Sequence, residues 1–228
     1  MRGLMKKAII LLSGGMDSST LLHYVKLTLK AGKILALSFD YGQRHSRELA
    51  MAGWQAKKAG VREHRLLDMS FMRRVIAGAS ALTDPAARIP ALSELSAGRR
   101  RQPPTYVPNR NMILLAIAAA YAEANGCTDV FYGAHAQDRY GYWDCTPEFI
   151  ARLNRTLALN RKKPVVIHAP FAGMSKAAIL KIGMKLRVDY RHTWTCYRGG
   201  RRPCGTCPTC AERVQAFLRA GLRDPLSR

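Results

Sequence analysis

The N-terminal part of the sequence contains one stretch that restricts the possible folds more than any other. Residues 8–12 are a short aliphatic run, as found in a strand that is buried on both faces of a sheet. The run leads into Ser13, Gly14 and Gly15, and residues 17–30 then have the composition of a helix. The glycines let the backbone approach an anion closely, and a helix N-terminus offers unpaired N–H groups. We therefore expect an α/β fold with an anion site at this loop.

The side chains of the loop suit the same chemistry. Ser13, Ser18 and Ser19 can donate hydroxyl groups, while Asp17 can either cap the helix or reach a magnesium ion. The loop lacks the Gly-Lys-Ser/Thr ending of a Walker A motif and the three spaced glycines of a dinucleotide fingerprint. An ordinary turn between a strand and a helix is the alternative interpretation.

Length and composition bound the class of protein. A chain of 228 residues with 48% hydrophobic side chains can bury one good core, and no apolar run reaches the length of a membrane span. Residues 1–7 resemble the start of a signal peptide only briefly, because polar Ser13 and Asp17 follow too soon. We therefore predict a cytoplasmic protein with one main domain.

The charge balance is strongly basic. The chain has 37 Lys and Arg against 15 Asp and Glu, a formal charge of +22, which would suit nucleic acid or an acidic partner. However, the basic residues are spread along the chain, with local clusters only at residues 99–101, 161–163 and 198–202, and no known nucleic-acid motif accompanies them. A generally basic surface is the alternative, so a nucleic-acid partner stays open but is not favoured.

Strand-like and helix-like segments alternate along most of the chain. Further strands are expected at residues 34–40, 64–69, 129–134 and 165–170, and helices at 46–60, 112–124, 147–160, after 175, and at 211–221. This alternation predicts a doubly wound, Rossmann-like parallel sheet with right-handed crossovers. Residues 71–102 show neither the apolar spacing of a helix nor that of a strand. We expect a mobile connecting region there with one short helix.

Several polar residues are candidates for a ligand site, because ligands of open α/β sheets bind beyond the carboxyl ends of the strands. Arg110 precedes a buried helix and can contact a phosphate, unless it ties down its loop through carbonyls. Lys176 lies in the first turn of another helix, where it is either a phosphate contact or a surface charge. Tyr142 and Asp144 lie in an aromatic loop that offers stacking faces and a carboxylate to a flat heterocycle.

Four of the six cysteines form a compact motif near the C-terminus. Cys196, Cys204, Cys207 and Cys210 have the spacing C-x7-C-x2-C-x2-C, and such overlapping pairs typically aim four thiolates at one tetrahedral ion, usually zinc. Four sulfur ligands leave no position for water, so we expect a structural site. Disulfides, which a cytoplasmic chain disfavours, and an iron–sulfur cluster are the alternatives. Cys127 is expected in the core, and Cys145 in the core or a pocket wall.

The loop and the cysteine motif together are more specific than either alone. The loop resembles the SGGxDS pyrophosphate loop of the N-type ATP pyrophosphatases, and nearly the whole chain resembles the family of 7-cyano-7-deazaguanine synthases. The segments that carry the resemblance are SGGMDSS at 13–19, YGQRHSRE at 41–48, LLDMS at 66–70, YVPNRN at 106–111, GYWDC at 141–145, SKA at 175–177, and TCY with CGTCPTC within 195–210. Two positions differ from typical members, which have glycine in place of Asn109 and proline in place of Trp143.

The resemblance implies a fold and a reaction. The fold would be that of the adenine nucleotide alpha hydrolases, with an α/β domain at residues 1–190 and a small zinc-binding helical segment at 191–228 packed on it. The enzyme would use MgATP to adenylate 7-carboxy-7-deazaguanine. Ammonia would displace AMP to give the amide, and a second adenylation would give the nitrile preQ0 for queuosine or archaeosine. The family usually forms a homodimer.

The resemblance also implies residue roles. ATP would be bound by Leu12, Ser13, Gly14, Gly15, Met16, Asp17, Ser18, Ser19, Thr20, Leu21 and Leu22. The four cysteines would hold Zn²⁺. Our own expectation is that Arg110, Lys176 and Asp17 act on the phosphates. From loop position alone, we also expect Tyr142 and Asp144 to contact the heterocycle and Arg44 or His45 to lie near the reacting carboxylate.

Other functions remain open from the sequence. A related enzyme could join a deazapurine or similar acyl group to a different amine, or an ATP pyrophosphatase could modify a tRNA base. A zinc-stabilised regulator would bind ATP without turnover.

Overall fold

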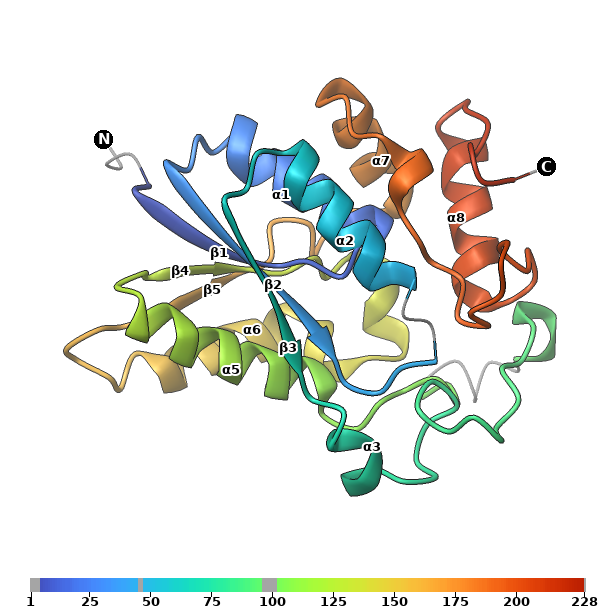
Figure 1. Ribbon diagram of the computed structural model, residues 1–228, viewed down its shortest axis with the longest axis horizontal. Helices are drawn as coiled ribbons and strands as arrows, with labels where there is room; N and C mark the ends of the chain where they lie inside the picture. The colour runs from blue at the N-terminus through green and yellow to red at the C-terminus, as the bar shows by residue number, and fades with distance from the viewer. Residues whose placement is uncertain (1–4, 45–46, 96–101, 228) are drawn as a thin grey trace.

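A parallel sheet forms the centre of the computed structural model, which describes residues 5–44, 47–95 and 102–227 (Figure 1). Its five strands lie in the order β3-β2-β1-β4-β5. They are β1 (Lys7–Leu11), β2 (Lys33–Asp40), β3 (Glu63–Asp68), β4 (Asp129–Phe131) and β5 (Val166–His168). Every pair of neighbours is parallel, so the predicted doubly wound sheet is confirmed. Strand order reverses between β1 and β4, and the carboxyl ends of these two strands are where such folds bind ligands.

Helices cover both faces of the sheet. Figure 1 shows α1 (Met16–Leu27), α2 (Arg47–Lys58) and α7 (Lys176–Lys185) on one face, and α5 (Arg110–Ala124) and α6 (Pro147–Leu157) on the other. The last helix, α8 (Pro208–Arg219), packs beside α7 near the carboxyl ends of the strands. Among the described residues, no helix is long and apolar enough to span a membrane.

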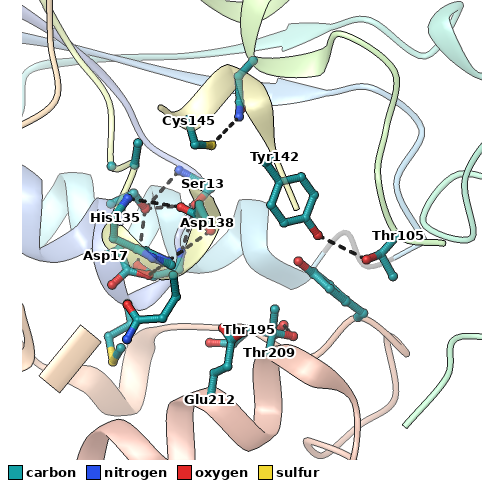
Figure 2. A pocket seen from close by; sticks show the side chains of 18 of the residues that line it. Ser13, Asp17, Thr105, His135, Asp138, Tyr142, Cys145, Thr195, Thr209 and Glu212 are labelled. Carbon is teal, nitrogen blue, oxygen red and sulfur yellow. Dashed lines mark hydrogen bonds and ion pairs between the residues drawn. The ribbon is translucent and has the colours of Figure 1, made fainter. Parts of the chain in front are cut away.

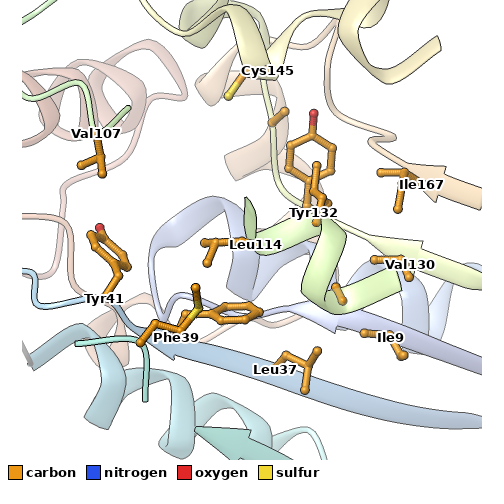
Figure 3. Close-up of a cluster of buried hydrophobic side chains, with 14 of the residues drawn as sticks. Ile9, Leu37, Phe39, Tyr41, Val107, Leu114, Val130, Tyr132, Cys145 and Ile167 are labelled. Carbon is orange, nitrogen blue, oxygen red and sulfur yellow. The ribbon is translucent and has the colours of Figure 1, made fainter. Parts of the chain in front are cut away.

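Alternating side chains of the strands fill two apolar layers. Ile9 and Leu37 point toward α5 and join one buried cluster, which Figure 3 shows together with Val130, Ile167 and Leu114. The neighbours of Ile9 on β1, Ala8 and Ile10, belong to the other cluster beneath α1 and α2. Both faces of β1 and of most of β2 are therefore buried, which explains their aliphatic runs, whereas the edge strand β3 is polar and partly exposed.

Hydroxyl side chains fix the starts of two helices near the ligand edge. The Thr146 hydroxyl accepts a hydrogen bond from the Phe149 amide at 3.1 Å at the start of α6. The Ser175 hydroxyl accepts one from the Ala178 amide at 3.2 Å and so fixes the start of α7. Each cap satisfies one of the amides that a helix N-terminus leaves unpaired.

The described part of the connecting region after β3 is anchored to the core. It contains the single-turn helix α3 (Met72–Val75) and the 3₁₀ turn η1 (Leu92–Glu94), where the sequence predicted one short helix. Leu82 and Ile89 are buried in the same apolar cluster as Val107, and Leu95 is also buried. The irregular backbone of this connecting region is thus fixed to the core by apolar side chains at intervals along it.

One buried arginine holds the C-terminal segment together. Arg213 of α8 is 2% exposed, and its guanidinium makes two hydrogen bonds of 2.9 and 3.0 Å to the Asp224 carboxylate. The same guanidinium donates to the Tyr190 carbonyl at 3.0 Å and to the Thr193 hydroxyl at 2.7 Å. These bonds join α8, the chain after it and the segment before the cysteines. A division of the chain at residue 190 stays a prediction.

Gly14 fixes the loop after β1 against α2. Its φ is +79°, and a Cβ at this position would lie 2.1 Å from the Glu48 carbonyl oxygen and 2.6 Å from the Ala52 amide nitrogen. The backbone of α2 therefore occupies the space of a side chain. The Gly14 carbonyl also accepts a hydrogen bond from the Trp194 amide at 2.9 Å. Only glycine satisfies the dihedral angle and the close approach together.

We expect Gly14→Ala to lower the free energy of unfolding by about 2–4 kcal/mol, because overpacking adds to the strain of a left-handed alanine. Gly126→Ala is the matched control, since Gly126 has a φ of +60° and no atom within 4 Å of its added Cβ. This control is expected to lose only about 1 kcal/mol, from backbone strain alone. Urea unfolding measures both losses. Equal losses would mean that the contact with α2 does not require glycine.

Candidate functional site

A cavity of about 900 Å³ lies at the carboxyl ends of β1 and β4. Its walls come from the loop after β1, the end of β2, the loop after β4, the starts of α5 and α7, residues 194–197 and α8. Pockets of this size hold a nucleotide or a similar ligand. The cavity thus lies at the switch point of the strand order, where the sequence placed the ligand site.

The phosphate loop contributes one side of the cavity. Leu12, Ser13, Gly15, Met16, Asp17 and Ser18 line it, whereas the other residues predicted to bind ATP, which are Gly14, Ser19, Thr20, Leu21 and Leu22, lie behind them. The Ser13 and Ser18 hydroxyls lie 3.0 Å apart, and the Ser13 amide donates to the Ser18 hydroxyl at 3.2 Å. Thr20 instead meets the Tyr190 hydroxyl at 2.7 Å. The inner residues support the loop, and the outer ones face the cavity.

Asp17 does not cap α1. Gly15 holds the N-cap position without any side-chain cap, and Asp17 lies in the first turn with its Oδ1 atom buried and without a hydrogen-bond partner. A carboxylate oxygen in this state, beside a loop suited to phosphate, fits a divalent cation bound together with phosphate oxygens.

A cluster of charged groups surrounds Lys176. Lys176 is 6% exposed, and its ammonium lies 2.7 Å from the Glu212 carboxylate of α8. The His135 Nε2 atom lies 3.3 Å from Asp138 and 3.6 Å from Asp17. Figure 2 shows Asp17, His135 and Asp138 together beside Ser13, with Glu212 facing them from α8. The interpretation of Lys176 as a surface charge is therefore wrong.

Burial sets the charge states in this cluster. Burial raises the pKa of Asp17, and it raises the pKa of Asp138 to about 7, although Lys176 opposes both shifts. Burial and the nearby Lys176 lower the pKa of His135 well below its usual value. Burial also acts against the charged form of Lys176, but Glu212, Asp17 and Asp138 outweigh it and raise the pKa of this lysine. At neutral pH, the cluster therefore has a charged lysine, a neutral histidine and an aspartate close to half protonation.

Aromatic hydroxyls form the other end of the cavity. We use the name tyrosine pocket for Tyr41, Tyr142 and Tyr197, which line the cavity together with Arg110. Arg110 donates a hydrogen bond to the Tyr41 hydroxyl at 3.1 Å, and its guanidinium carbon lies 5.5 Å from the centre of the Tyr41 ring. The Tyr142 and Thr105 hydroxyls lie 3.2 Å apart, across the cavity from the phosphate loop (Figure 2). Arg110 is thus bonded to a side chain of the cavity wall, and it donates to no loop carbonyl of the residues that the structure describes.

Asn109 places Arg110 at the start of α5. Its φ is +54°, a left-handed conformation that asparagine tolerates better than most other residues and that glycine adopts freely. Asn109 stands where the resembling family typically has glycine. The substitution therefore preserves the backbone turn that aims Arg110 at the cavity.

Asp144 and Arg44 make structural contacts. Asp144 is 1% exposed and does not line the cavity, and its carboxylate accepts hydrogen bonds from the amide and the side chain of Asn111 at 2.9 and 3.3 Å. Arg44 donates to the Ala87 carbonyl at 2.6 Å and is not part of the cavity wall either. Their contacts with a substrate stay predictions, as does that of His45, which lies outside the described residues.

Several cavity residues were not predicted as functional from the sequence: Tyr41, Thr105, His135, Asp138, Tyr197 and Glu212. Tyr41 and Tyr197 fall inside the family-like segments YGQRHSRE and TCY, so a signal for them existed. His135 and Asp138 lie in the same loop after β4 as Tyr142. The sequence-based prediction for this loop was made mainly from its aromatic residues. Glu212 had no signal, because only the folding of the cysteine segment brings α8 to the cavity.

The four cysteines of the motif converge on one point. Their sulfur atoms all lie within 4.8 Å of one another, and those of Cys204 and Cys210 are 3.9 Å apart. Tetrahedral zinc with Zn–S bonds of about 2.3 Å requires sulfur atoms about 3.8 Å apart. The Cys204 amide lies 3.4 Å from the Cys196 sulfur, and the Cys207 amide lies 3.3 Å from the Cys204 sulfur. The thiols are free, so the cluster is a metal site and not a pair of disulfides.

The two cysteines outside the cluster have the expected surroundings. Cys127 is buried in the core, and its thiol contacts the Lys7 and Asp129 carbonyls. Cys145 is 5% exposed and contributes to the cavity wall, where burial raises its pKa. Neither sulfur belongs to the metal site.

Comparison with known proteins agrees with this geometry. Residues 7–221 match the family described as "Queuosine biosynthesis protein QueC". The chain belongs to the QueC family. The 7-cyano-7-deazaguanine synthase of Archaeoglobus fulgidus is 47% identical, with 96% of this chain and 89% of that protein covered. The synthase of Clostridium kluyveri is 43% identical, with 97% of each chain covered.

A solved structure extends the likeness of the fold beyond the QueC family. The U34-tRNA thiolase NcsA from Methanococcus maripaludis superposes with a TM-score of 0.52 at 16% identity, with 87% of this chain and 64% of that chain covered. This likeness is confined to the fold, an α/β fold with a five-stranded parallel sheet like that of the adenine nucleotide alpha hydrolases.

Asp138→Asn is expected to stabilise the ligand-free protein by about 1–3 kcal/mol more at pH 8 than at pH 5, because the wild type loses stability across this range. The unfolded carboxyl has a pKa near 3.8 and the folded one about 7, so the stability of the wild type falls as the pH rises between these values. Asparagine does not ionise, so the free energy of unfolding of the variant does not fall in this way as the pH rises. Calorimetric unfolding at both pH values measures the effect.

Glu148→Gln is the matched control for this prediction, because the Glu148 side chain is 71% exposed and its ion pair with Arg152 lies on the surface. It should change stability little at either pH. A destabilised Asp138→Asn protein at pH 8 would show that the charged carboxylate contributes more through its contacts than it loses by burial.

Proposed function

We propose that this chain is a 7-cyano-7-deazaguanine synthase, a ligase that converts 7-carboxy-7-deazaguanine and ammonia to the nitrile with consumption of ATP. The observation that carries the proposal is one cavity with a phosphate loop on one side and a tyrosine pocket on the other. Relatives with this activity in their names align over nearly the whole chain at 43–47% identity. A nucleotide and a flat aromatic acid can therefore meet in one site.

The reaction requires activation because a carboxylate is a poor electrophile. One carboxylate oxygen attacks the α-phosphorus of ATP, and pyrophosphate leaves. Ammonia then attacks the acyl carbon, AMP leaves with the former carboxylate oxygen, and a proton is lost to give the amide. The amide oxygen then attacks the α-phosphorus of a second ATP, and a second pyrophosphate leaves. Loss of AMP and of both N–H protons then leaves the nitrile.

The phosphate loop and Lys176 are the groups we assign to the pyrophosphate. Ser13, Ser18 and the first residues of α1 line the cavity, and so does Lys176, whose ammonium pairs with Glu212 and is attracted by Asp17. Such preorganised donors stabilise charge that develops on a leaving group. Magnesium bound with ATP would spread this charge further, and Asp17 is its candidate protein ligand.

The cysteine cluster is assigned to one structural zinc ion. Four thiolates at these distances close the tetrahedral shell, so the ion takes no part in the reaction. Its effect is positional, because Cys196 precedes Tyr197 of the tyrosine pocket and Cys210 precedes Glu212 in α8. The metal would therefore fix the positions of these two walls of the cavity relative to each other. A homodimer and a cytoplasmic location complete the proposal, on the resemblance to the family.

A tRNA-modifying enzyme of the same fold is the second candidate, and the formal charge of +22 favours it. The basic clusters at residues 161–163 and 198–202 are exposed, and residues 99–101 lie outside the described part of the chain. The two candidates differ in whether a free heterocyclic acid is turned over without RNA.

Mass spectrometry of the products tests the proposed function. The purified, zinc-loaded protein is incubated with MgATP, ammonium and 7-carboxy-7-deazaguanine, in the absence of RNA. We expect the nitrile, with AMP and pyrophosphate as coproducts. Accumulation of the acyl adenylate or the amide would instead indicate another amine as the acceptor. No reaction would favour an RNA substrate.

Cys207→Ser is expected to lose the bound metal, about one zinc per chain in the wild type, and to lower the melting temperature. Cys127→Ser is the matched control, because its thiol is buried in the core away from the cluster and the metal content should stay unchanged. Elemental analysis measures zinc and iron, and an iron–sulfur cluster would also colour the protein. Full zinc content in Cys207→Ser would contradict the assignment.

A further inference from the structure

The cavity contains two cations with different surroundings. Lys176 is neutralised by Glu212 and is influenced by Asp17 and Asp138. Arg110 forms no ion pair with a carboxylate within 4.0 Å among the described residues, and it lines the cavity together with Tyr41, Tyr142 and Tyr197. A guanidinium that is withdrawn from water without an acidic partner is costly in the free protein. Within the described part of the chain, Arg110 is therefore a cavity cation without a paired carboxylate.

The nearest acidic residue supports Arg110 without pairing with it. Asp144 influences the Arg110 guanidinium, but both of its carboxylate oxygens accept hydrogen bonds from Asn111, the next residue of α5. These hydrogen bonds between Asp144 and Asn111 hold the first turn of α5, which also carries Arg110. One guanidinium N–H donates to the Tyr41 hydroxyl, and an arginine has five such donors. Arg110 is thus fixed in place and has donors left for a ligand.

We propose that Arg110 binds the carboxylate of the heterocyclic acid, and not the phosphates of ATP. The inference rests on the proposed function, in which two anions enter one cavity. The phosphates have the loop and Lys176 on the side of Asp17 and Asp138, opposite Tyr142 (Figure 2). The carboxylate is the second anion, and a planar guanidinium matches it with two parallel hydrogen bonds. The assignment of Arg110 to the phosphates, made from the sequence, is replaced by this one.

The geometry gives Arg110 a positioning function in the first half of the reaction. The tyrosine rings offer faces to the flat heterocycle, while the guanidinium turns its carboxylate in a defined direction. One oxygen of the acid can then meet the α-phosphorus of ATP. In the second half the substrate is the neutral amide, which has no charge for Arg110 to pair with. Arg110 therefore distinguishes the two substrates of the enzyme.

Comparison of the two half-reactions tests this inference. The wild type and Arg110→Met are each supplied with MgATP and either the acid plus ammonium or the amide alone. We expect Arg110→Met to raise KM for the acid about 10–100-fold, as loss of a charge-assisted bidentate pair predicts. KM for ATP should change less than about twofold, and amide turnover less than about threefold, because those contacts remain. Arg110→Lys should restore part of the affinity for the acid.

Arg65→Met is the matched control. Arg65 lies over the Tyr121 ring at 5.6 Å, much as Arg110 lies over Tyr41, but its side chain is 58% exposed on β3 and outside the cavity wall. Its kinetic constants with both substrates should equal those of the wild type. The melting temperature of each variant reports whether it is folded.

The possible failures are distinguishable. If Arg110→Met or Arg110→Lys raises KM for ATP, or slows the acid and the amide reactions equally, Arg110 serves the phosphates and the inference is wrong. If the wild type converts neither the acid nor the amide, the proposed function is wrong. Binding of the acid to wild type and to both variants, measured by calorimetry without ATP, then decides the Arg110 assignment by itself.

Discussion

The close contact of the phosphate loop with α2 and with the Trp194 segment is the constraint on which the rest of the site depends. Gly14 brings its backbone against the Glu48 carbonyl, and its own carbonyl accepts the Trp194 amide. The loop is thereby held between a helix of the main sheet and the segment that leads into the four cysteines. Trp194 is followed directly by Thr195, Cys196 and Tyr197, so the fixed loop also fixes the opposite wall of the cavity. The metal cluster and Arg213 then keep α8 in place. Parts of the chain that are distant in sequence form one rigid site for this reason.

The charges of the cavity oppose stability in the absence of ligands. Lys176, Asp17 and Asp138 are withdrawn from water around His135, and Arg110 lacks an acidic partner among the described residues. Each of these groups would be better solvated in the unfolded chain. Their arrangement is understandable when a nucleotide, its cation and an organic acid supply the missing countercharges. The cysteine cluster and the buried pair of Arg213 with Asp224 stand next to this region, where they offset its tendency to open.

Patterns along the chain predicted the sheet and the cluster, but not the direction of single side chains. Strands that are buried on both faces are continuous aliphatic runs, and a zinc knuckle has a fixed spacing, so both were readable from the sequence. Asp144 follows a strand in a loop that does reach the cavity, yet its carboxylate turns inward to Asn111. Arg44 follows β2 and turns to Ala87. Glu212 reaches Lys176 only because α8 folds back on α7. Periodicity determines which face a residue occupies within an element, but loops have no period and contacts between distant helices leave no local trace.

The basic surface and the chemistry of the cavity are separable. Among the described residues that line the cavity, Asp17, Asp138, Glu48 and Glu212 outnumber Lys176 and Arg110, whereas the exposed clusters at residues 161–163 and 198–202 are positive. Both proposed substrates other than ammonia are anions, so a positive exterior raises their concentration near the protein without contacting them. An acidic interior would repel the same anions unless their charges met specific cations. Lys176 and Arg110 are these cations, and they stand with the phosphate loop and the tyrosine pocket respectively. The distribution of charge therefore favours two anionic ligands, each bound in one orientation, and does not require a nucleic acid to explain the excess of arginine and lysine.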